Sequence, residues 1–213
     1  MNAPTRAFTP AEAAVVGGLE LKAVNNAIDK RIVEVPVRAS KRRELTAENV
    51  LQLKLWHEIG PILSQERRQR LFGLIRENPA ARTIRADNLV IVDVAEARKQ
   101  VNQRTKDLAE AEAMVVKSRD VMGAEPVFKG TRIPVRLVAT MRAQGADDGE
   151  ILSGYPKLTA RQLELAEIWA AAHPRRGRPK SLADRGLKAK ASRRTKLGSD
   201  PLAKSSETSL PPV

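Results

Sequence analysis

The sequence contains no cysteine and only two histidines, His57 and His173, which restricts the chemistry available to the chain. Without cysteine there are no disulfides, thiolate metal ligands or Cys nucleophiles. Each histidine stands alone at the end of a predicted helix, so we predict no metal site. The phosphate-binding patterns GxxxxGKS/T and GxGxxG and the nucleophile pattern GxSxG are also absent. We therefore predict no catalytic residues, no cofactor and no enzymatic activity.

Aromatic residues make up only 3% of the chain, and no run approaches the ~18 consecutive apolar residues that a membrane span needs. A core with so few aromatics is built mainly from Leu, Val, Ile and Ala, as in helical modules. Residues 1–8 contain no apolar segment of the kind found in signal peptides. We therefore expect a cytoplasmic, nucleoid-associated protein with no membrane partner. The expected fold class is mainly α with short β elements (α+β).

Basic charge is abundant: the chain has 38 Lys and Arg against 25 Asp and Glu, a net charge of +13. Such an excess favours a polyanion as one partner. Residues 175–213 contain 11 Lys and Arg and 3 Asp and Glu, so this tail alone carries a net +8. The tail has no aromatic residue. Because it has too little apolar surface to offset its ordering entropy, we predict that it is disordered when free.

Residues 176–180 of this tail resemble the core of an AT-hook. In such a core, glycine lets the backbone lie deep in a narrow A·T minor groove, and proline keeps the chain extended. The flanking arginines are attracted by the negative potential of that groove. The alternative is a generic basic tail. The candidate residues for minor-groove or toxin binding are Arg175, Arg176, Gly177, Arg178, Pro179 and Lys180.

The N-terminal sequence predicts two short helices around a glycine turn. Capping residues favour a helix over residues 10–16, two glycines end it, and a second helix follows over residues 20–30. This is the helix-turn-helix arrangement, in which the second helix enters the major groove. Asparagine suits contact with adenine, and lysine suits guanine or phosphate. The second helix supplies the candidates Lys22, Asn25, Asn26 and Lys30.

Residues 32–37 predict a strand, which Pro36 confines to a sheet edge. A basic cluster at the tip and return of the predicted hairpin adds the candidate DNA contacts Arg38, Lys41, Arg42 and Arg43. A leucine-rich helix then runs to residue 56. The order of helix, turn, helix, basic hairpin and helix resembles the winged domains of the MerR or excisionase type. We therefore assign residues 1–56 to a winged helix-turn-helix domain.

Residues 57–112 are predicted to form a connector of helices and strands. A helix over residues 64–78 has outward arginines interleaved with glutamates, which favours a solvated face over contact with nucleic acid. Strands are predicted at residues 89–94 and 114–117, and a charged helix over residues 93–112 joins them. This β-α-β piece would pair its two strands either within one chain or between two chains.

Residues 113–174 are predicted to form a hairpin followed by three short helices. Glycine and proline punctuate the hairpin, and helices are expected over residues 135–144, 147–155 and 159–173. On the first of these helices, Leu137 is expected to face inward together with two other apolar residues. The module is therefore expected to be compact and trihelical.

This module resembles the prokaryotic family catalogued as domain of unknown function 433. The residues that carry the resemblance are Gly130, Thr131, Arg132, Ile133, Pro134, Val135, Tyr155 and Pro156. Members of that family are associated with VapB-type antitoxins, which pair with a PIN-like ribonuclease toxin encoded alongside. The resemblance therefore implies a regulatory binding protein and carries over no catalytic residues.

Together these features predict an antitoxin of a type II toxin–antitoxin pair. It would neutralise a cognate PIN-like ribonuclease toxin and repress its own operon by binding operator DNA as a homodimer. Either the trihelical module or the basic tail would contact the toxin. The alternative is a stand-alone transcriptional regulator or nucleoid-associated protein without a toxin partner.

Overall fold

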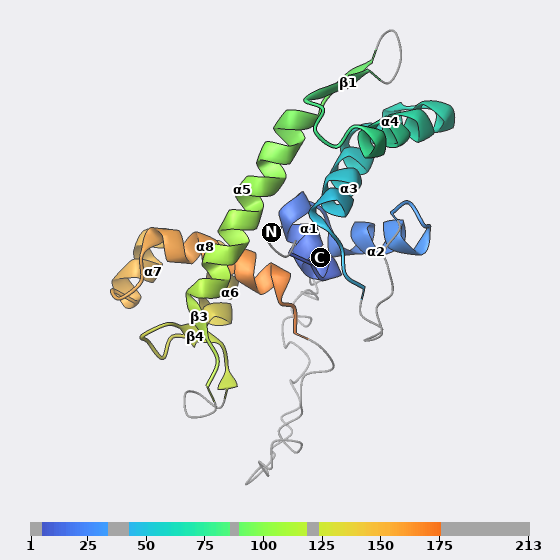
Figure 1. Ribbon diagram of the computed structural model, residues 1–213. Helices are drawn as coiled ribbons and strands as arrows, with labels where there is room; N and C mark the ends of the chain where they lie inside the picture. Colours follow the sequence, from blue (N-terminus) through green and yellow to red (C-terminus); the bar gives the residue numbers. More distant parts are fainter. Residues whose placement is uncertain (1–5, 34–42, 86–89, 119–123, 176–213) are drawn as a thin grey trace, which may run out of the picture. The chain divides into compact units, whose positions relative to one another are not determined.

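A long helix, α5 (Val94–Ala113), packs against three other helices, α1, α3 and α8 (Figure 1). The computed structural model describes residues 6–33, 43–85, 90–118 and 124–175. Helix α5 begins where the Asp93 side chain accepts a hydrogen bond from the backbone N–H of Glu96 at 3.1 Å. Its 20 residues extend about 30 Å at 1.5 Å per residue. Both its start and its end agree closely with the prediction from sequence.

The two predicted N-terminal helices are confirmed as α1 (Pro10–Gly17) and α2 (Leu21–Asp29). Helix α1 begins with the predicted capping box, because Thr9 and Glu12 exchange side-chain and backbone hydrogen bonds. It ends at Gly18, whose φ of 69° is in the left-handed region that favours glycine. A Cβ at this position would lie 1.9 Å from Nη1 of Arg104 on α5. The turn between α1 and α2 is therefore specified by backbone geometry.

The predicted strand over residues 32–37 is wrong for its first two residues. Arg31 has a φ of 55°, and the backbone N–H of Ile32 donates to the Ala27 carbonyl at 2.9 Å. The chain therefore folds back on the end of α2, and Ile32 and Val33 form a bend. The rest of the predicted strand, together with Arg38, Lys41 and Arg42, lies outside the described residues.

Helix α3 (Ala47–Ile59) leads through a 3₁₀ turn, η1 (Gly60–Ile62), into α4 (Gln65–Glu77). Thr46 caps α3 and Ser64 caps α4. Two short strands follow, β1 (Thr83–Arg85) and β2 (Ile91–Asp93), and they pair antiparallel with Ile84 opposite Val92. The sequence analysis missed β1, which has only three residues.

The predicted order of strand, helix and strand is confirmed as β2, α5 and β3 (Val115–Val116), but β2 and β3 do not pair with each other within this chain. Instead, β3 pairs antiparallel with β4 (Val127–Phe128). The physical reason is the straight connection: α5 joins β2 to β3 directly and holds them about 30 Å apart. Each strand pairs with a neighbour that a short loop brings back, which costs less closure entropy.

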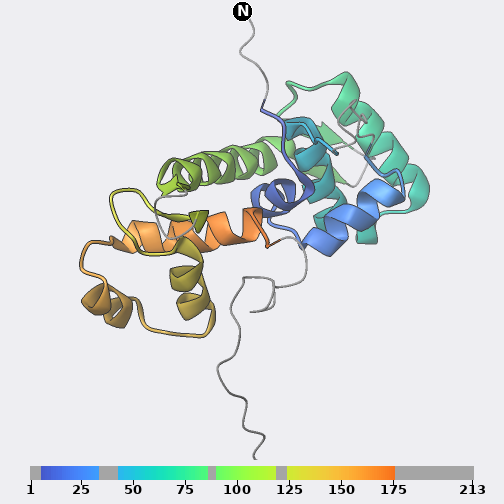
Figure 2. The same ribbon diagram turned by 90° about the horizontal axis from the view of Figure 1, so that it is seen from below.

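The predicted hairpin and trihelical module is confirmed. The helices are α6 (Val135–Ala143), α7 (Asp148–Gly154) and α8 (Ala160–Ala172). Gly145, with a φ of 87°, follows the end of α6, and the side chains of Asp147 and Thr159 cap α7 and α8. Helix α8 packs against α6, α5 and α1 (Figure 2).

Three clusters of buried apolar side chains form the core, and α5 contributes to each of them. Val94 and Ala97 pack with α3, α4 and the β1–β2 hairpin, and Ala111 packs with α6, α7 and α8. Val101 and Leu108 pack with α1, α2 and α3. In the described ranges the fold is thus mainly helical with two short antiparallel sheets, in agreement with the predicted α+β class.

Arg161 ties α8 to α5 at the surface. Its Nη2 lies 2.6 Å from the Asp107 carboxylate and 2.8 Å from that of Glu110. Hydrogen bonds to Glu110, Asp107 and Glu164 raise the pKa of Arg161 above its ordinary value. None of the helices described here is both long enough and apolar enough to cross a membrane.

Candidate functional site

Helix α2 is amphipathic in the way that the helix-turn-helix prediction requires. Val24 and Ala27 are buried and hold the helix on α1 and α3. On the other side, the predicted contact residues Lys22, Asn26 and Lys30 are exposed, and Asn25 is half-buried. Asn26 is therefore a better candidate for contact with a base than Asn25.

After the segment that carries the predicted basic hairpin, the chain comes back to lie beside the start of α1. Phe8, just before α1, and Leu45, just before α3, exchange two backbone hydrogen bonds of 2.8 Å in an antiparallel bridge. Two residues earlier, the exposed Arg43 lies 2.8 Å from the Asp29 carboxylate at the end of α2. The structure thus brings Arg43, of the predicted hairpin cluster, next to the predicted recognition helix.

A basic cavity of about 450 Å³ lies beside the end of α2. Lys30 and Arg31 line it just after the end of α2, and Arg68 and Arg76 line it from α4. The Arg68 guanidinium lies 5.1 Å from the centre of the Trp56 ring, which holds it by a cation–π contact. Arg31 was not among the residues predicted from sequence, and the position of α4 beside α2 was not predicted either. Positive charge on both helices was visible in the sequence, but their proximity depends on tertiary packing.

The family motif forms the turn that leads from β4 into α6. Gly130 has a φ of 77°, and the hydroxyl of Thr131 donates to the Phe128 carbonyl at 2.9 Å. The same hydroxyl accepts from the backbone N–H of Ile133 at 3.0 Å, and Pro134 is the N-terminal cap of α6. Val135 is buried, Arg132 is exposed, and Tyr155 and Pro156 lie at the end of α7. These residues have a structural role in starting and stopping helices.

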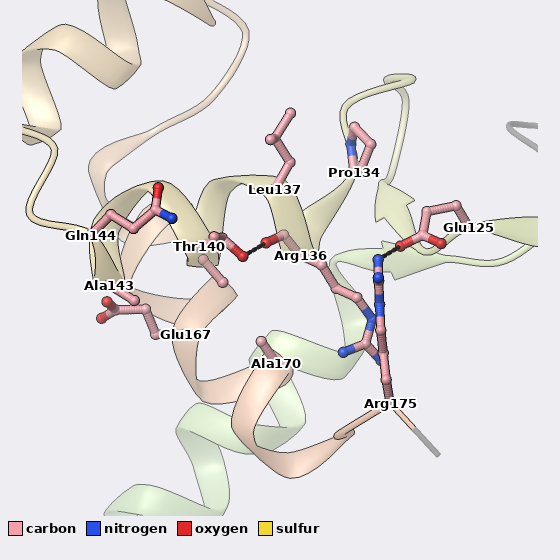
Figure 3. A pocket seen from close by; sticks show the side chains of 11 residues that line it. Glu125, Pro134, Arg136, Leu137, Thr140, Ala143, Gln144, Glu167, Ala170 and Arg175 are labelled. Carbon is pink, nitrogen blue, oxygen red and sulfur yellow. Dashed lines mark hydrogen bonds and ion pairs between the residues drawn. The ribbon is translucent and has the colours of Figure 1, made fainter. Parts of the chain in front are cut away.

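A groove of about 800 Å³ runs between α6 and α8 (Figure 3). Leu137 on its rim is 42% exposed, so the prediction that it faces inward is wrong. The reason is that Val138 and Ala139 take the buried positions of this short helix, and Leu137 is left on the open side. Ala139, Ala143 and Ala170 also line the groove, and their small side chains leave the depression open.

One end of this groove holds two arginines (Figure 3). Arg136 donates to the His173 carbonyl at 2.5 Å, and its guanidinium lies 5.0 Å from the centre of the Trp169 ring. Arg175 lies 3.3 Å from the Glu125 carboxylate. Burial lowers the pKa of Arg136, and the charge of Arg175 acts in the same direction, whereas Glu125 raises it. The residues here carry an excess of positive charge that an anion would relieve.

Glu12, Glu112 and His173 form the one group of possible metal ligands found in the described ranges, with ligand atoms within 4.8 Å of one another. The prediction from sequence found no ligand partner for His173, because these three residues are far apart along the chain. Arg6 contacts both carboxylate oxygens of Glu112, at 2.9 and 2.8 Å, and Glu12 accepts from the Thr9 backbone in the cap of α1. The ion pair of Glu112 with Arg6 and the role of Glu12 in the α1 cap therefore account for both carboxylates.

Comparison with known proteins identifies the relatives of this chain. A family model described as "Protein of unknown function (DUF433)" matches residues 115–170. The uncharacterized protein y4eO of Sinorhizobium fredii (strain NBRC 101917 / NGR234) is 32% identical over 199 residues, covering 86% of this chain and 89% of that protein. The chain belongs to the y4eO family. No solved structure matches this chain.

The match to the DUF433 model confirms the resemblance that the motif of this y4eO-family chain suggested. Its limits enclose β3, β4, α6, α7 and most of α8, which is the predicted hairpin and trihelical module. The similarity to y4eO extends well beyond the module. Three points stay predictions: the association with VapB-type antitoxins, the resemblance of the N-terminal region to MerR-type winged domains, and the boundaries between the four predicted segments.

Proposed function

We propose that the chain is a DNA-binding regulator of the antitoxin type, which binds operator DNA and a PIN-like ribonuclease toxin. The observation that supports DNA binding is the α1–α2 pair, in which α2 buries Val24 and Ala27 and exposes Lys22, Asn26 and Lys30. A recognition helix needs a buried face that fixes its position and an outward face of amides and cations for base edges.

Contacts to phosphates would position this helix on the duplex. Arg43 beside the end of α2 and Arg31 at its C-terminus are exposed cations within the same region. Arg38, Lys41 and Arg42, which lie outside the described residues, are further candidates for phosphate contacts. Such contacts carry no sequence information but fix register and supply most of the affinity. Because operator half-sites usually mirror a two-fold protein, we propose a homodimer.

The antitoxin half of the proposal is supported by the family motif and by the basic tail. A ribonuclease that holds Mg²⁺ with carboxylates has a negatively charged cleft. Residues 175–213 carry a net +8, from 11 Lys and Arg and 3 Asp and Glu, and are complementary to such a cleft. Arg or Lys side chains inserted there would pair with the carboxylates and compete with the metal.

Two substitutions on this surface have different expected effects on DNA binding. Asn26→Ala removes a base contact, so we expect it to cost about 1–3 kcal/mol of discrimination at one base pair. Arg43→Ala removes a phosphate contact, so we expect it to weaken binding to all sequences and to flatten the salt dependence by about one unit. Selection from a random duplex pool measures the first effect, and anisotropy titration over a salt series measures the second.

Lys99→Ala is the matched control, because Lys99 is an exposed cation on α5, away from α2. It should change neither base preference nor salt slope. If Asn26→Ala leaves base preference unchanged, α2 is not the recognition helix.

A further inference from the structure

The groove between α6 and α8 lies outside the proposed DNA surface and has an open apolar rim. Its volume of about 800 Å³ is lined by three alanines and by Leu137, which is 42% exposed. An exposed leucine beside a depression of this size can bind an aliphatic side chain of another protein. In Figure 3, Leu137 points away from the side chain of Arg136.

The charges along the groove are uneven. At one end Arg136 and Arg175 share a single neighbouring carboxylate, that of Glu125. At the other end Arg142 pairs with both Asp148 and Glu167, at 2.8 and 2.9 Å. The first end therefore has one cation in excess. It is also the end at which the chain continues into the basic tail.

We propose that this groove is the docking surface for an acidic segment of the toxin, with an aliphatic side chain against Leu137 and a carboxylate between Arg136 and Arg175. The proposal rests on the antitoxin function and names the surface that would serve it. An acidic partner is favoured, because this end of the groove has one cation in excess and the chain carries a net +13. Arg175, the last described residue, lines this end of the groove.

The test uses the full-length chain co-expressed with the protein encoded by the adjacent reading frame. We expect wild type to hold that protein stoichiometrically in native mass spectrometry. Leu137→Asp should weaken the complex about tenfold or more in calorimetry, because it removes the apolar contact and places a charge against the partner's aliphatic side chain. Arg175→Glu should weaken it to a similar extent. The matched control is Ile62→Asp, because Ile62 is an apolar side chain on η1 that is 77% exposed.

The outcomes separate the groove from the function. A complex that loses affinity with Leu137→Asp but not with Ile62→Asp, while both variants still bind DNA, supports the proposal. If Leu137→Asp binds the neighbour protein as tightly as wild type, the groove is not the docking surface and the antitoxin function stands. If Leu137→Asp dissociates a homodimer instead, the occupant is a second copy. If wild type holds no neighbour protein, the antitoxin function and the groove both fail.

Discussion

Replacing Phe128 by alanine should lower the free energy of unfolding by about 3–5 kcal/mol. The Phe128 side chain on β4 is fully buried in the core cluster that α6, α7 and α8 share with Ala111 of α5. The loss would therefore combine the transfer free energy of the ring with an unrelaxed cavity.

Urea denaturation followed by circular dichroism measures this effect, with the slope of the transition expected to stay constant. The control is Lys129→Ala, because the adjacent Lys129 is exposed, and its replacement should change stability by no more than about 0.5 kcal/mol. A loss of less than about 1 kcal/mol for Phe128→Ala would mean that the β3–β4 hairpin is not packed on the three helices as described.

Removing residues 176–213 should have the largest effect on DNA binding. This segment carries 10 Lys and Arg and 3 Asp and Glu, a net +7. If about four of these cations contact phosphates, the slope of log K against log salt becomes less steep by about 3–4 on their removal. Base preference should not change, since phosphate contacts carry no sequence information.

Anisotropy titrations of the shortened and full-length chains over a salt series measure this change. A full-length variant with Arg176, Arg178 and Lys180 replaced by alanine separates the AT-hook-like core from the remaining tail cations. The shortened chain should also fail to neutralise the toxin if the tail is the inhibitor. An unchanged salt slope would exclude the tail from DNA binding, and full neutralisation would assign inhibition to the trihelical module.

The sequence predicted the helices well because their ends are encoded locally. Thr9, Ser64, Asp93 and Thr159 each cap a helix within three residues, and such hydrogen bonds do not depend on the rest of the fold. The observed strand partners could not be predicted, because β1 and β3 are too short for a periodic pattern.

Residues of the candidate site could be predicted from sequence only where they lie together on a single helix. The exposed and buried faces of α2 follow from its 3.6-residue period, so Lys22, Asn26 and Lys30 were found. Arg136 and Arg175 are 39 residues apart in sequence and meet only because α8 packs on α6. Proximity of this kind cannot be derived from composition or period. The groove and the cavity between α2 and α4 therefore emerge from tertiary packing alone.

The most direct test of DNA recognition is a competition assay with the full-length protein at about 0.15 M salt. The labelled duplex is the region upstream of its own reading frame, and the competitors are that same region and a shuffled duplex of equal length and composition. The account predicts that the upstream region competes about 10³-fold or more better than the shuffled duplex. Equal competition by the two duplexes would contradict it, since binding would then depend on charge alone.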